Sequence, residues 1–341
     1  MNVKKTSLKD IAKVVGCSTT TVSNVLNGKG FFGEGVKAKV LAAVKKYNYA
    51  INASARNLRM GKTETVGVLF YRPNADIFKS EFYLTMMYSL QKELFNLGYE
   101  ILLSEYTDAN ANSAEIPRIV RNGRVDGVVI LGGFPFIACG LLSEMQIPTI
   151  MLDSFSPRLD SIITNGEKSG FDSVKALADL GHRRIAYFAY SAEDYNTDRR
   201  IDGFLKAVKE LKLDVSNSPL IRDFADNDGA CAAFDKLMKS ASKLPTAIVA
   251  SNDSLAASLM SHAQNIGYSV PRDISFFGHD DTFVSTRSTP QLSTVHVDTS
   301  AIGVIGAHMI VDRIKNPLGP LVHKIFDCAT CLRGSIAAPS A

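Results

Sequence analysis

The sequence predicts an α/β protein with two parts: a small three-helix N-terminal head, and a larger two-lobed body whose parallel sheets are flanked by helices. Three observations predict this division. Residues 1–62 hold twelve Lys and Arg but two Asp and Glu, a net charge of +10, whereas the remaining residues carry −6. Within the head, two short helical patterns meet at a glycine. From Val66 onward, strand-like runs alternate with helix-like runs.

The composition is that of an ordinary globular protein and excludes several classes. The 341 residues are 46% hydrophobic and 21% charged. No apolar run approaches the ~18 residues that a membrane-spanning helix needs, so we expect no membrane partner. The first ten residues, MNVKKTSLKD, lack the apolar core of a secretory signal, and five scattered cysteines do not form a disulfide framework. We therefore expect a cytoplasmic protein.

The first part of the head has the pattern of a helix-turn-helix unit. Apolar residues recur at helical spacing in residues 8–15, and Gly16 can supply the positive φ of a tight turn. Ser18 is a suitable N-cap for a second helix, whose apolar face consists of Val22, Val25 and Leu26. The outer face of that helix carries small polar side chains, which suit base edges and phosphates.

A third amphipathic stretch, residues 36–47, completes the head. We expect Val40, Leu41 and Val44 to face inward and the lysines at 37, 39, 45 and 46 to face outward. A short basic head on a longer acidic body indicates that the head meets a polyanion and the body does not. The alternative from charge alone is a solvated basic tail.

Residues 8–27, LKDIAKVVGCSTTTVSNVLN, resemble the DNA-binding head of the lactose-repressor (LacI/GalR) family. The resemblance implies that the second helix lies in the major groove, where Thr19, Thr20 and Asn24 would read bases. It further implies that Ser18, Thr21 and Ser23 contact phosphates and that Asn27 helps to hold the third helix and the backbone. The sequence departs from the family at Gly33 and Val36, where a Ser and a Thr are usual, so two phosphate contacts are expected to be lost.

Residues 50–62 resemble the hinge that joins head to body in the same family. Asn52, Ala55, Arg56 and Leu58 match the family pattern, although Ile51 stands where a Pro is usual. The resemblance implies that two hinge helices, one from each protomer, order together in the minor groove, and that Leu58 wedges into a base step and kinks the DNA. The alternative is a plain flexible linker.

The body shows strand and helix patterns in the following order. Strands are predicted at 66–71, 100–104, 127–131 and 148–152 for one lobe, and at 184–190, 246–250 and 273–277 for the other. Helices are predicted at 80–97 and near 112–122, 168–180, 197–211, 228–240 and 252–266. This alternation predicts parallel sheets with helices on both faces.

The body resembles the periplasmic-binding-protein fold that the family carries behind its head. The matching runs include VDGVV at 125–129, LGHRRIA at 180–186, NDSLA at 252–256 and GHDD at 278–281. The resemblance divides the chain into a DNA-binding domain (1–49), a hinge helix (50–62) and an effector-binding and dimerisation domain (63–341). Its N-lobe is expected at about 63–163 and 297–321, and its C-lobe at about 164–296 and 322–341.

Polar residues follow several of the predicted strands, where parallel sheets bind ligands. The resemblance implies that Asp153, Arg200, Asn252 and Asp280 hydrogen-bond a small effector between the lobes, and that Phe82 and Tyr83 line the N-lobe side. Tyr71 and Asn165 are weaker candidates. Thr164-Asn165 replaces the Asp-Asn step usual in the family. The alternative for Asn252 and Asp280 is a structural role in capping helices and strand ends.

No catalytic or metal-binding pattern accompanies these features. Cys328-x-x-Cys331 has no second pair to complete a zinc site, and no nucleophile-base arrangement is evident, so we expect no enzyme, no cofactor and no metal. The sequence predicts a transcriptional regulator, a repressor, that binds a pseudo-palindromic double-stranded operator as a homodimer. Its small-molecule effector is expected to be a sugar. The alternative is a solute-binding protein of a transport system, which would need the body but not the head.

Overall fold

The computed structural model describes residues 6–26, 32–47, 49, 62–71, 77–107, 109–110, 114–192, 194–240 and 243–340. The chain separates into two compact units, Met1–Thr63 and Glu64–Ala341, which are the head and the body. Among the described residues, no helix combines the length and the apolar composition that crossing a membrane requires.

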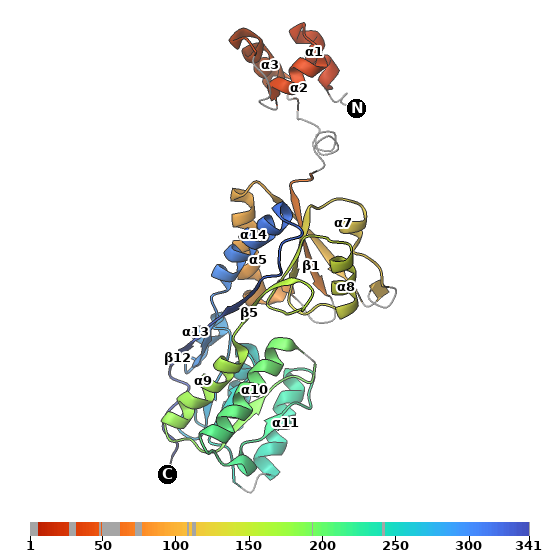
Figure 1. The fold of residues 1–341 in the computed structure, drawn as a ribbon. Helices are drawn as coiled ribbons and strands as arrows, with labels where there is room; N and C mark the ends of the chain where they lie inside the picture. The colour runs from red at the N-terminus through yellow and green to blue at the C-terminus, as the bar shows by residue number, and fades with distance from the viewer. Residues whose placement is uncertain are drawn as a thin grey trace. The chain divides into compact units, whose positions relative to one another are not determined.

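The head is a three-helix unit around a small core (Figure 1). Its helices are α1 (Leu8–Val15), α2 (Thr19–Leu26) and α3 (Glu34–Lys46). Gly16 ends α1 with a φ of 75°, as the turn between the first two helices requires. The core residues come from all three helices: Ile11, Ala12, Val22, Val25, Val40 and Ala43. The expectation that Leu41 faces inward is wrong, because it is 48% exposed and Ala43 is buried instead.

The first lobe of the body is built on a parallel six-stranded sheet. Its strand order is β11-β5-β4-β3-β1-β2, formed by His323–Phe326, Asp160–Thr164, Thr149–Leu152, Gly127–Leu131, Thr65–Tyr71 and Glu100–Tyr106. All residues of β3 are buried because helices cover both faces. Val129 and Leu131 pack toward α5 (Glu81–Asn96) and α14 (Thr299–Lys315). Val128 and Ile130 pack toward α7 (Arg118–Arg121) and α8 (Phe136–Glu144) on the other side (Figure 1).

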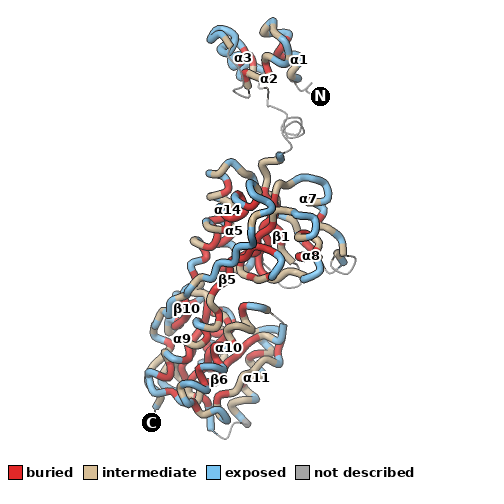
Figure 2. Tube along the Cα trace, in the orientation of Figure 1, coloured by how far each residue is buried: buried red, intermediate tan, exposed pale blue. Residues whose placement is uncertain are grey.

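The second lobe repeats this architecture with four parallel strands. The order is β7-β6-β8-β9, formed by Leu220–Ile221, Ile185–Phe188, Ala247–Ala250 and Ser275–Phe277. One face packs on α9 (Gly166–Asp179) and α10 (Tyr195–Glu210), and the other on α11 (Asn227–Ser240) and α12 (Asp253–Asn265). Figure 2 shows that burial is concentrated along the central strands of both lobes.

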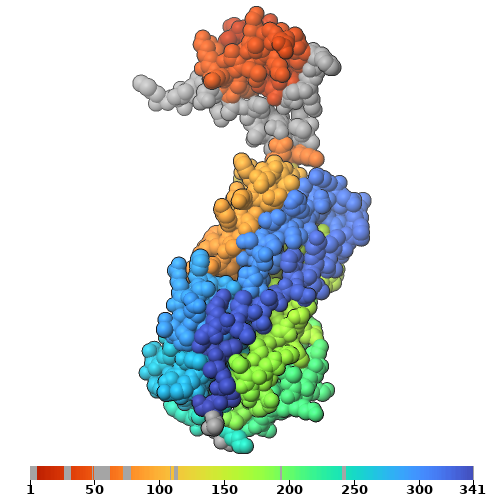
Figure 3. Space-filling model, turned by 90° about the vertical axis from the view of Figure 1, so that its left-hand side faces the viewer, coloured from red at the N-terminus to blue at the C-terminus, as the bar shows by residue number. Residues whose placement is uncertain are grey.

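The chain crosses between the lobes more than once. Strand β10 (Thr294–His296) in the second lobe precedes α14 in the first, and β11 precedes β12 (Ala329–Cys331), which pairs antiparallel with β10. Figure 3 shows the blue C-terminal part of the chain running over both lobes on one face. The structure differs here from the expected lobe boundary at residue 322. Strand β11 pairs with β5 in the first sheet, so the return to the second lobe follows Phe326.

A buried ion pair holds this returning segment in place. The Arg313 guanidinium donates to both carboxylate oxygens of Asp160 at 2.7 Å, and the side chains are 9% and 3% exposed. Asp160 also accepts from the backbone of Val322, and Arg313 donates to the carbonyls of Gly319 and Pro320. Because both charges have several partners, this pair can stay buried without an uncompensated ion.

The seven predicted body strands all form, and five of the six predicted helices match long helices of the structure. The helix expected near 112–122 is shorter, because α7 begins only after Pro117. The sequence reading did not single out α8, α13 (Phe283–Arg287) or α14, nor the strands β5, β7, β10, β11 and β12.

Candidate functional site

Helix α2 presents the predicted DNA-contact residues of the head. The Ser18 hydroxyl accepts from the backbone N–H of Thr21 at 3.0 Å, which confirms Ser18 as the N-cap. Because Val22 and Val25 are buried in the head, the opposite face of α2 is turned outward. Thr20 is exposed there, and Thr19 and Asn24 are partly exposed. A capped helix N-terminus with small polar side chains suits contact with phosphates and base edges.

The described lysines of the head lie on its surface. Lys9 and Lys13 on α1, and Lys37, Lys39, Lys45 and Lys46 on α3, are all exposed. This placement gives the head a cationic surface around helix α2, which itself carries no charged side chain. The remaining candidates, Asn27 and the hinge residues Asn52, Ala55, Arg56 and Leu58, lie outside the described residues, and their roles stay predictions.

A cleft of about 400 Å³ lies between the two lobes of the body. Its lining comes largely from the carboxyl ends of strands in both sheets, because that is where loops leave a parallel sheet. The segments after β4, β6, β8 and β9 contribute, as do the first turns of α5 and α10. The lining residues are Tyr71, Ser80, Phe82, Tyr83, Leu131, Gly132, Gly133, Asp153, Thr164, Tyr190, Ala192, Asp194, Thr197, Arg200, Ala225, Asn252, His279, Asp280 and Val297.

Asp153 joins the two lobes across the cleft. Its carboxylate accepts from the Tyr83 hydroxyl at 3.0 Å within the first lobe and from the Asn196 amide of the second lobe at 2.7 Å. The same amide donates to the Asp153 carbonyl at 2.9 Å. Gly132 makes room for Tyr83, because a Cβ there would lie 2.8 Å from the phenol oxygen. Asp153 has a φ of 57°, which is unusual for a residue other than glycine.

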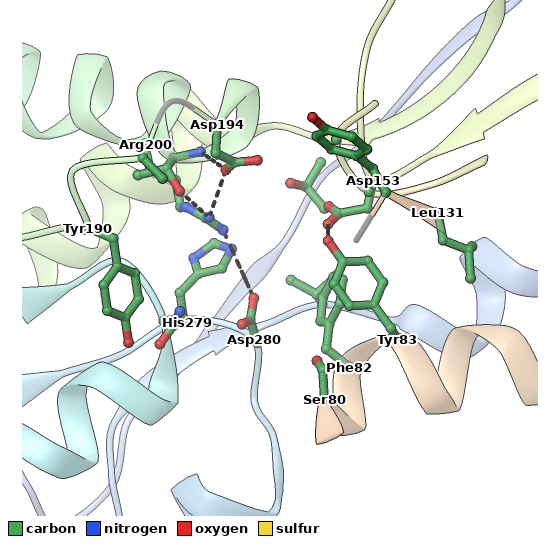
Figure 4. Close-up of a pocket in the computed structure, with 18 of the residues that line it drawn as sticks. Ser80, Phe82, Tyr83, Leu131, Asp153, Tyr190, Asp194, Arg200, His279 and Asp280 are labelled. Carbon is green, nitrogen blue, oxygen red and sulfur yellow. Dashed lines mark hydrogen bonds and ion pairs between the residues drawn. The ribbon is translucent and has the colours of Figure 1, made fainter. Parts of the chain in front are cut away.

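Arg200 occupies the opposite wall, on α10 (Figure 4). Its guanidinium donates to the Thr197 hydroxyl at 3.2 Å and lies 3.9 Å from the Asp194 carboxylate and 4.0 Å from that of Asp280. The His279 ring lies beside Arg200, with Nε2 4.0 Å from Asp280. The buried Arg200 Nε and His279 Nε2 have no hydrogen-bond partner within the described part of the protein.

Burial shifts the protonation of these groups. Burial, reinforced by the nearby Asp194 charge, raises the pKa of Asp153 to about 7. Burial also raises the pKa of Asp280 well above its usual value, although Arg200 opposes this shift. Burial and the Arg200 charge hold the pKa of His279 well below its usual value, so this ring is neutral near pH 7. The side chains of Arg200 and Asp280, 12% and 19% exposed, are therefore largely dehydrated.

The structure brings all six predicted effector residues to this cleft: Phe82, Tyr83, Asp153, Arg200, Asn252 and Asp280. Asn252 is also the N-cap of α12, since its side-chain oxygen accepts from Leu255 N–H at 2.9 Å. Tyr71 lines the cleft as well. Asn165 is not among the lining residues; it caps α9, and its side chain donates to Asp327 at 2.9 Å.

Sequence reasoning missed Asp194, Asn196 and His279. Asp194 is the N-cap of α10, and an Asp just before the helical run from Tyr195 is a signal that could have placed it at the end of a helix facing the cleft. His279 lies within the GHDD run already noted. Asn196 carried no sequence signal, because its contact with Asp153 joins residues distant along the chain.

The acidic residues beside Asn252 and Asp280 face away from the cleft. Asp253 is 1% exposed and accepts from the Thr282 backbone at 2.7 Å and from the Thr294 hydroxyl. Asp281 accepts from Arg333 at 2.6 Å. These two carboxylates therefore brace the loops that present Asn252 and Asp280. Within the described residues, no group of His, Cys, Asp and Glu is arranged to hold a metal ion.

Two family descriptions match the chain. That of bacterial regulatory proteins of the lacI family matches residues 7–52, and that of a periplasmic binding protein-like domain matches residues 174–336. The first match lies within the head and the second within the body. The first contains α1, α2 and α3, and the second begins inside α9 and contains most of the second lobe, helix α14 of the first lobe and the returning C-terminal segment.

Curated relatives extend the similarity over most of the chain. The HTH-type transcriptional repressor PurR of Vibrio vulnificus is 31% identical over 321 residues, which cover 91% of this chain and 92% of the relative. The PurR of Vibrio cholerae is 31% identical over 320 residues with the same coverage.

Solved structures show the same fold. The lac repressor dimer bound to operator and the anti-inducer ONPF has a TM-score of 0.86 at 21% identity, and the match covers 98% of this chain and 100% of that one. The CelR–cellobiose complex has a TM-score of 0.71 at 22% identity, with coverage of 97% and 99%. A regulator from Enterococcus faecium with bound ribose has a TM-score of 0.69 at 24% identity, covering 80% and 99%.

Proposed function

Since the chain belongs to the LacI family of bacterial regulatory proteins and is a DNA-binding transcriptional regulator, we propose how it performs that regulation. A homodimer binds a pseudo-palindromic operator through its two heads and represses transcription, and a small-molecule effector in the body cleft sets the operator affinity. The observation that carries this proposal is the presence, in one chain, of a cationic helix-turn-helix unit and a polar cleft between two lobes.

In the proposed complex, α2 lies in the major groove of each half-site. Thr19, Thr20 and Asn24 read base edges, and the Asn24 side chain can accept from adenine N6 through its amide oxygen and donate to adenine N7 through its amide nitrogen. The hydroxyls of Ser18, Thr21 and Ser23 contact phosphates, as does the exposed N-terminus of α2. From the sequence alone, the proposal adds Asn27 beside the third helix, and the hinge residues Asn52, Ala55, Arg56 and Leu58 in the minor groove.

The effector binds among the six cleft residues, and we propose a sugar as its class. Arg200, Asp280 and Asn252 offer charged and amide groups to ring hydroxyls. Phe82 and Tyr83 pack edge to face with ring centroids 5.2 Å apart and give the cleft an apolar wall. Two structurally similar regulators hold cellobiose and ribose, which supports this class.

Contacts between the lobes provide a route from the cleft to the operator. Asn196 donates to Asp153 across the cleft, and the Phe283 N–H donates to Glu81 at 2.6 Å near the cleft mouth. An effector that contacts both walls favours one lobe arrangement over another, and thereby shifts the population able to bring two heads onto one operator.

The proposed place of action is the cytoplasm, where the bacterial chromosome lies. The alternative of a solute-binding protein for transport accounts for the body but gives no role to the head, which by itself matches the regulatory family over residues 7–52. The relatives are repressors rather than enzymes.

The proposal is tested with the full chain and the DNA upstream of its own gene. Fluorescence anisotropy should detect a complex with a specific fragment, and a sugar panel should change its affinity. The stoichiometry should be two chains per operator. A chain that stays monomeric and binds a scrambled duplex as well as the upstream DNA would contradict the proposal.

A further inference from the structure

The cleft contains more carboxyl groups than cationic groups. Asp153, Asp194 and Asp280 contribute three carboxylates, and Arg200 is the one lysine or arginine among the lining residues that the structure describes. His279 does not restore the balance near pH 7, because burial and Arg200 hold its pKa well below its usual value. When the three carboxylates are ionised, the cleft has a formal charge of −2 (Figure 4).

This excess is costly because the groups are partly dehydrated. The Asp280 side chain is 19% exposed and that of Arg200 is 12% exposed. The raised pKa of Asp153, about 7, reflects burial first and the neighbouring Asp194 second. Near pH 7 this carboxyl therefore retains a bound proton for part of the time. A cation in the cleft would favour the ionised form of the carboxyl groups around it.

Polar atoms in the same cleft lack partners, which indicates a ligand with hydrogen-bonding groups. His279 is 3% exposed, and its Nε2 has no hydrogen-bond partner in the described structure. The buried Nε of Arg200 is in the same state. The distance of 4.0 Å from Asp280 to both Arg200 Nη1 and His279 Nε2 is too long for direct hydrogen bonds. Hydroxyl groups of a ligand can bridge such separations.

A ligand with a phosphate or carboxylate group fits this charge poorly. The guanidinium of Arg200, which such a group would need, is already flanked by Asp194 at 3.9 Å and Asp280 at 4.0 Å. An added anion would meet both carboxylates in a partly dehydrated space, where charges interact more strongly than in water. An ammonium group meets the opposite field, in a cleft that Tyr71, Tyr83 and Tyr190 also line.

Building on the proposed function, we propose that the cleft binds a polyhydroxylated ligand with one protonated amine, an amino sugar in chemical class, and rejects phosphorylated and acidic sugars. Arg200, Asn252 and His279 take the hydroxyl groups, and the ammonium lies against the carboxylates of Asp194 and Asp280. This assignment explains why the cleft contains a third carboxylate in addition to the Asp153 and Asp280 expected from the sequence.

The test is calorimetric titration of the full chain with matched hexoses. The probes are glucosamine, galactosamine and mannosamine, the three parent hexoses, glucose 6-phosphate and glucuronate. We expect at least one amino hexose to bind about tenfold or more tightly than its parent hexose, since one added ion pair can supply this factor. Glucose 6-phosphate and glucuronate should not bind at millimolar concentration. Tighter binding of a parent hexose or an acidic sugar, or no binding of any amino hexose, would overturn the inference.

A charge-removing variant locates the amine. Asp194→Asn keeps an N-cap side chain on α10 but removes one carboxylate. The advantage of the amino hexose over its parent, measured as the ratio of their dissociation constants within the same variant, should fall about tenfold. The matched control is Asp198→Asn on the same helix. The Asp198 carboxylate accepts from the Arg222 guanidinium at 2.6 Å, and Asp198 does not line the cleft. The inference is overturned if Asp194→Asn leaves the advantage unchanged, or if Asp198→Asn removes it equally.

Operator binding in the same preparations separates this inference from the proposed function. If a parent hexose or hexose phosphate binds best and changes operator affinity, the amine preference is wrong and the proposed regulation stands. If the protein binds an amino hexose but no operator under any condition, the proposed function fails while the ligand preference stands.

Discussion

The head and the cleft use opposite kinds of polar surface. On α2, the proposed DNA-contact side chains are small and uncharged, and they cover the outside of a helix whose Val22 and Val25 are buried. In the cleft, Arg200 and Asp280 are charged groups with side chains 12% and 19% exposed. Exposed neutral groups keep their water until a partner replaces it, whereas buried charges have already lost much of theirs. We therefore expect many small contributions in the head and a few large ones in the cleft.

The largest expected effect is that of Arg200→Ala. Removing the guanidinium takes away the charged donor proposed for the hydroxyl groups of the effector and leaves Asp280 without its neighbouring cation, and truncating a buried charged contact typically costs about 2–5 kcal/mol of binding free energy. Effector affinity should fall by about a hundredfold or more. The operator affinity of the effector-free protein should stay near that of the wild type, because the head is unchanged. Titration of effector into a preformed operator complex measures both.

Arg200→Lys is the matched control for this prediction. It keeps the charge but loses the planar donor pair, so we expect effector affinity between those of the wild type and the Ala variant. An intact effector response in the Ala variant would remove Arg200 from the site. An equal loss of operator affinity in both variants would erase the contrast between head and cleft.

Asp153→Asn should change how stability depends on pH. Because the folded-state pKa of Asp153 is raised from 3.8 to about 7, its favourable contribution is fully present below about pH 4 and is lost as the pH rises toward 7. Over most of this range, the free energy of unfolding of the wild type should fall by about 1.4 kcal/mol per pH unit relative to that of the variant. Denaturant unfolding of both proteins at pH 5, 6 and 7 gives the difference.

Asp273→Asn is the control, because the pKa of Asp273 is shifted in the opposite direction from that of Asp153. Its hydrogen bond with Arg272 lowers the pKa of this exposed carboxyl, so its titration lies below the range tested. Between pH 5 and 7, the free energy of unfolding of this variant should therefore depend on pH in the same way as that of the wild type. If Asp153→Asn also runs parallel, then Asp153 does not carry the shifted titration and its place in the cleft electrostatics is wrong.

The difference between the head and the cleft also explains how much of each site could be predicted from the sequence. The helix-turn-helix residues of the head follow one another within a short segment, so the local sequence is sufficient to predict the turn at Gly16, the cap at Ser18 and the buried face at Val22 and Val25. Pattern and local chemistry are sufficient there. The inward position expected for Leu41 failed because a helix with small residues on several faces has no sharply defined apolar stripe, and Ala43 packs closer.

The cleft could be predicted only in part, because its residues come from many segments. Strand ends indicated Asp153, Asn252 and Asp280 correctly, since ligand sites in parallel sheets lie there. The hydrogen bond between Asn196 and Asp153 depends on how the two lobes meet. Strand β11 shows the same limit, because its residues are mostly exposed at a sheet edge and lack the pattern of a buried strand.

A smaller effect is expected for Asn24→Ala in the head. Loss of one bidentate base contact costs about 1–3 kcal/mol at a specific site and nothing at a scrambled one. Specific operator affinity should fall accordingly, while affinity for a scrambled duplex of equal length stays unchanged. Anisotropy titrations with the two duplexes make this comparison within one preparation. An equal loss on both duplexes would show that Asn24 contacts the backbone or supports the fold, and does not read bases.

The smallest effect is expected from a single surface lysine. Lys37→Gln removes one exposed charge from α3, and each lost phosphate contact lowers the slope of log affinity against log salt by about one, hence about two for a dimer. The decrease in this slope should be the same for operator and scrambled DNA. Lys209→Gln, on an exposed position of α10 in the acidic body, should leave the slope unchanged. Equal changes of the salt slope in both variants would mean that the body also contacts DNA. The contrast between a cationic head that binds DNA and a body that does not would then be wrong.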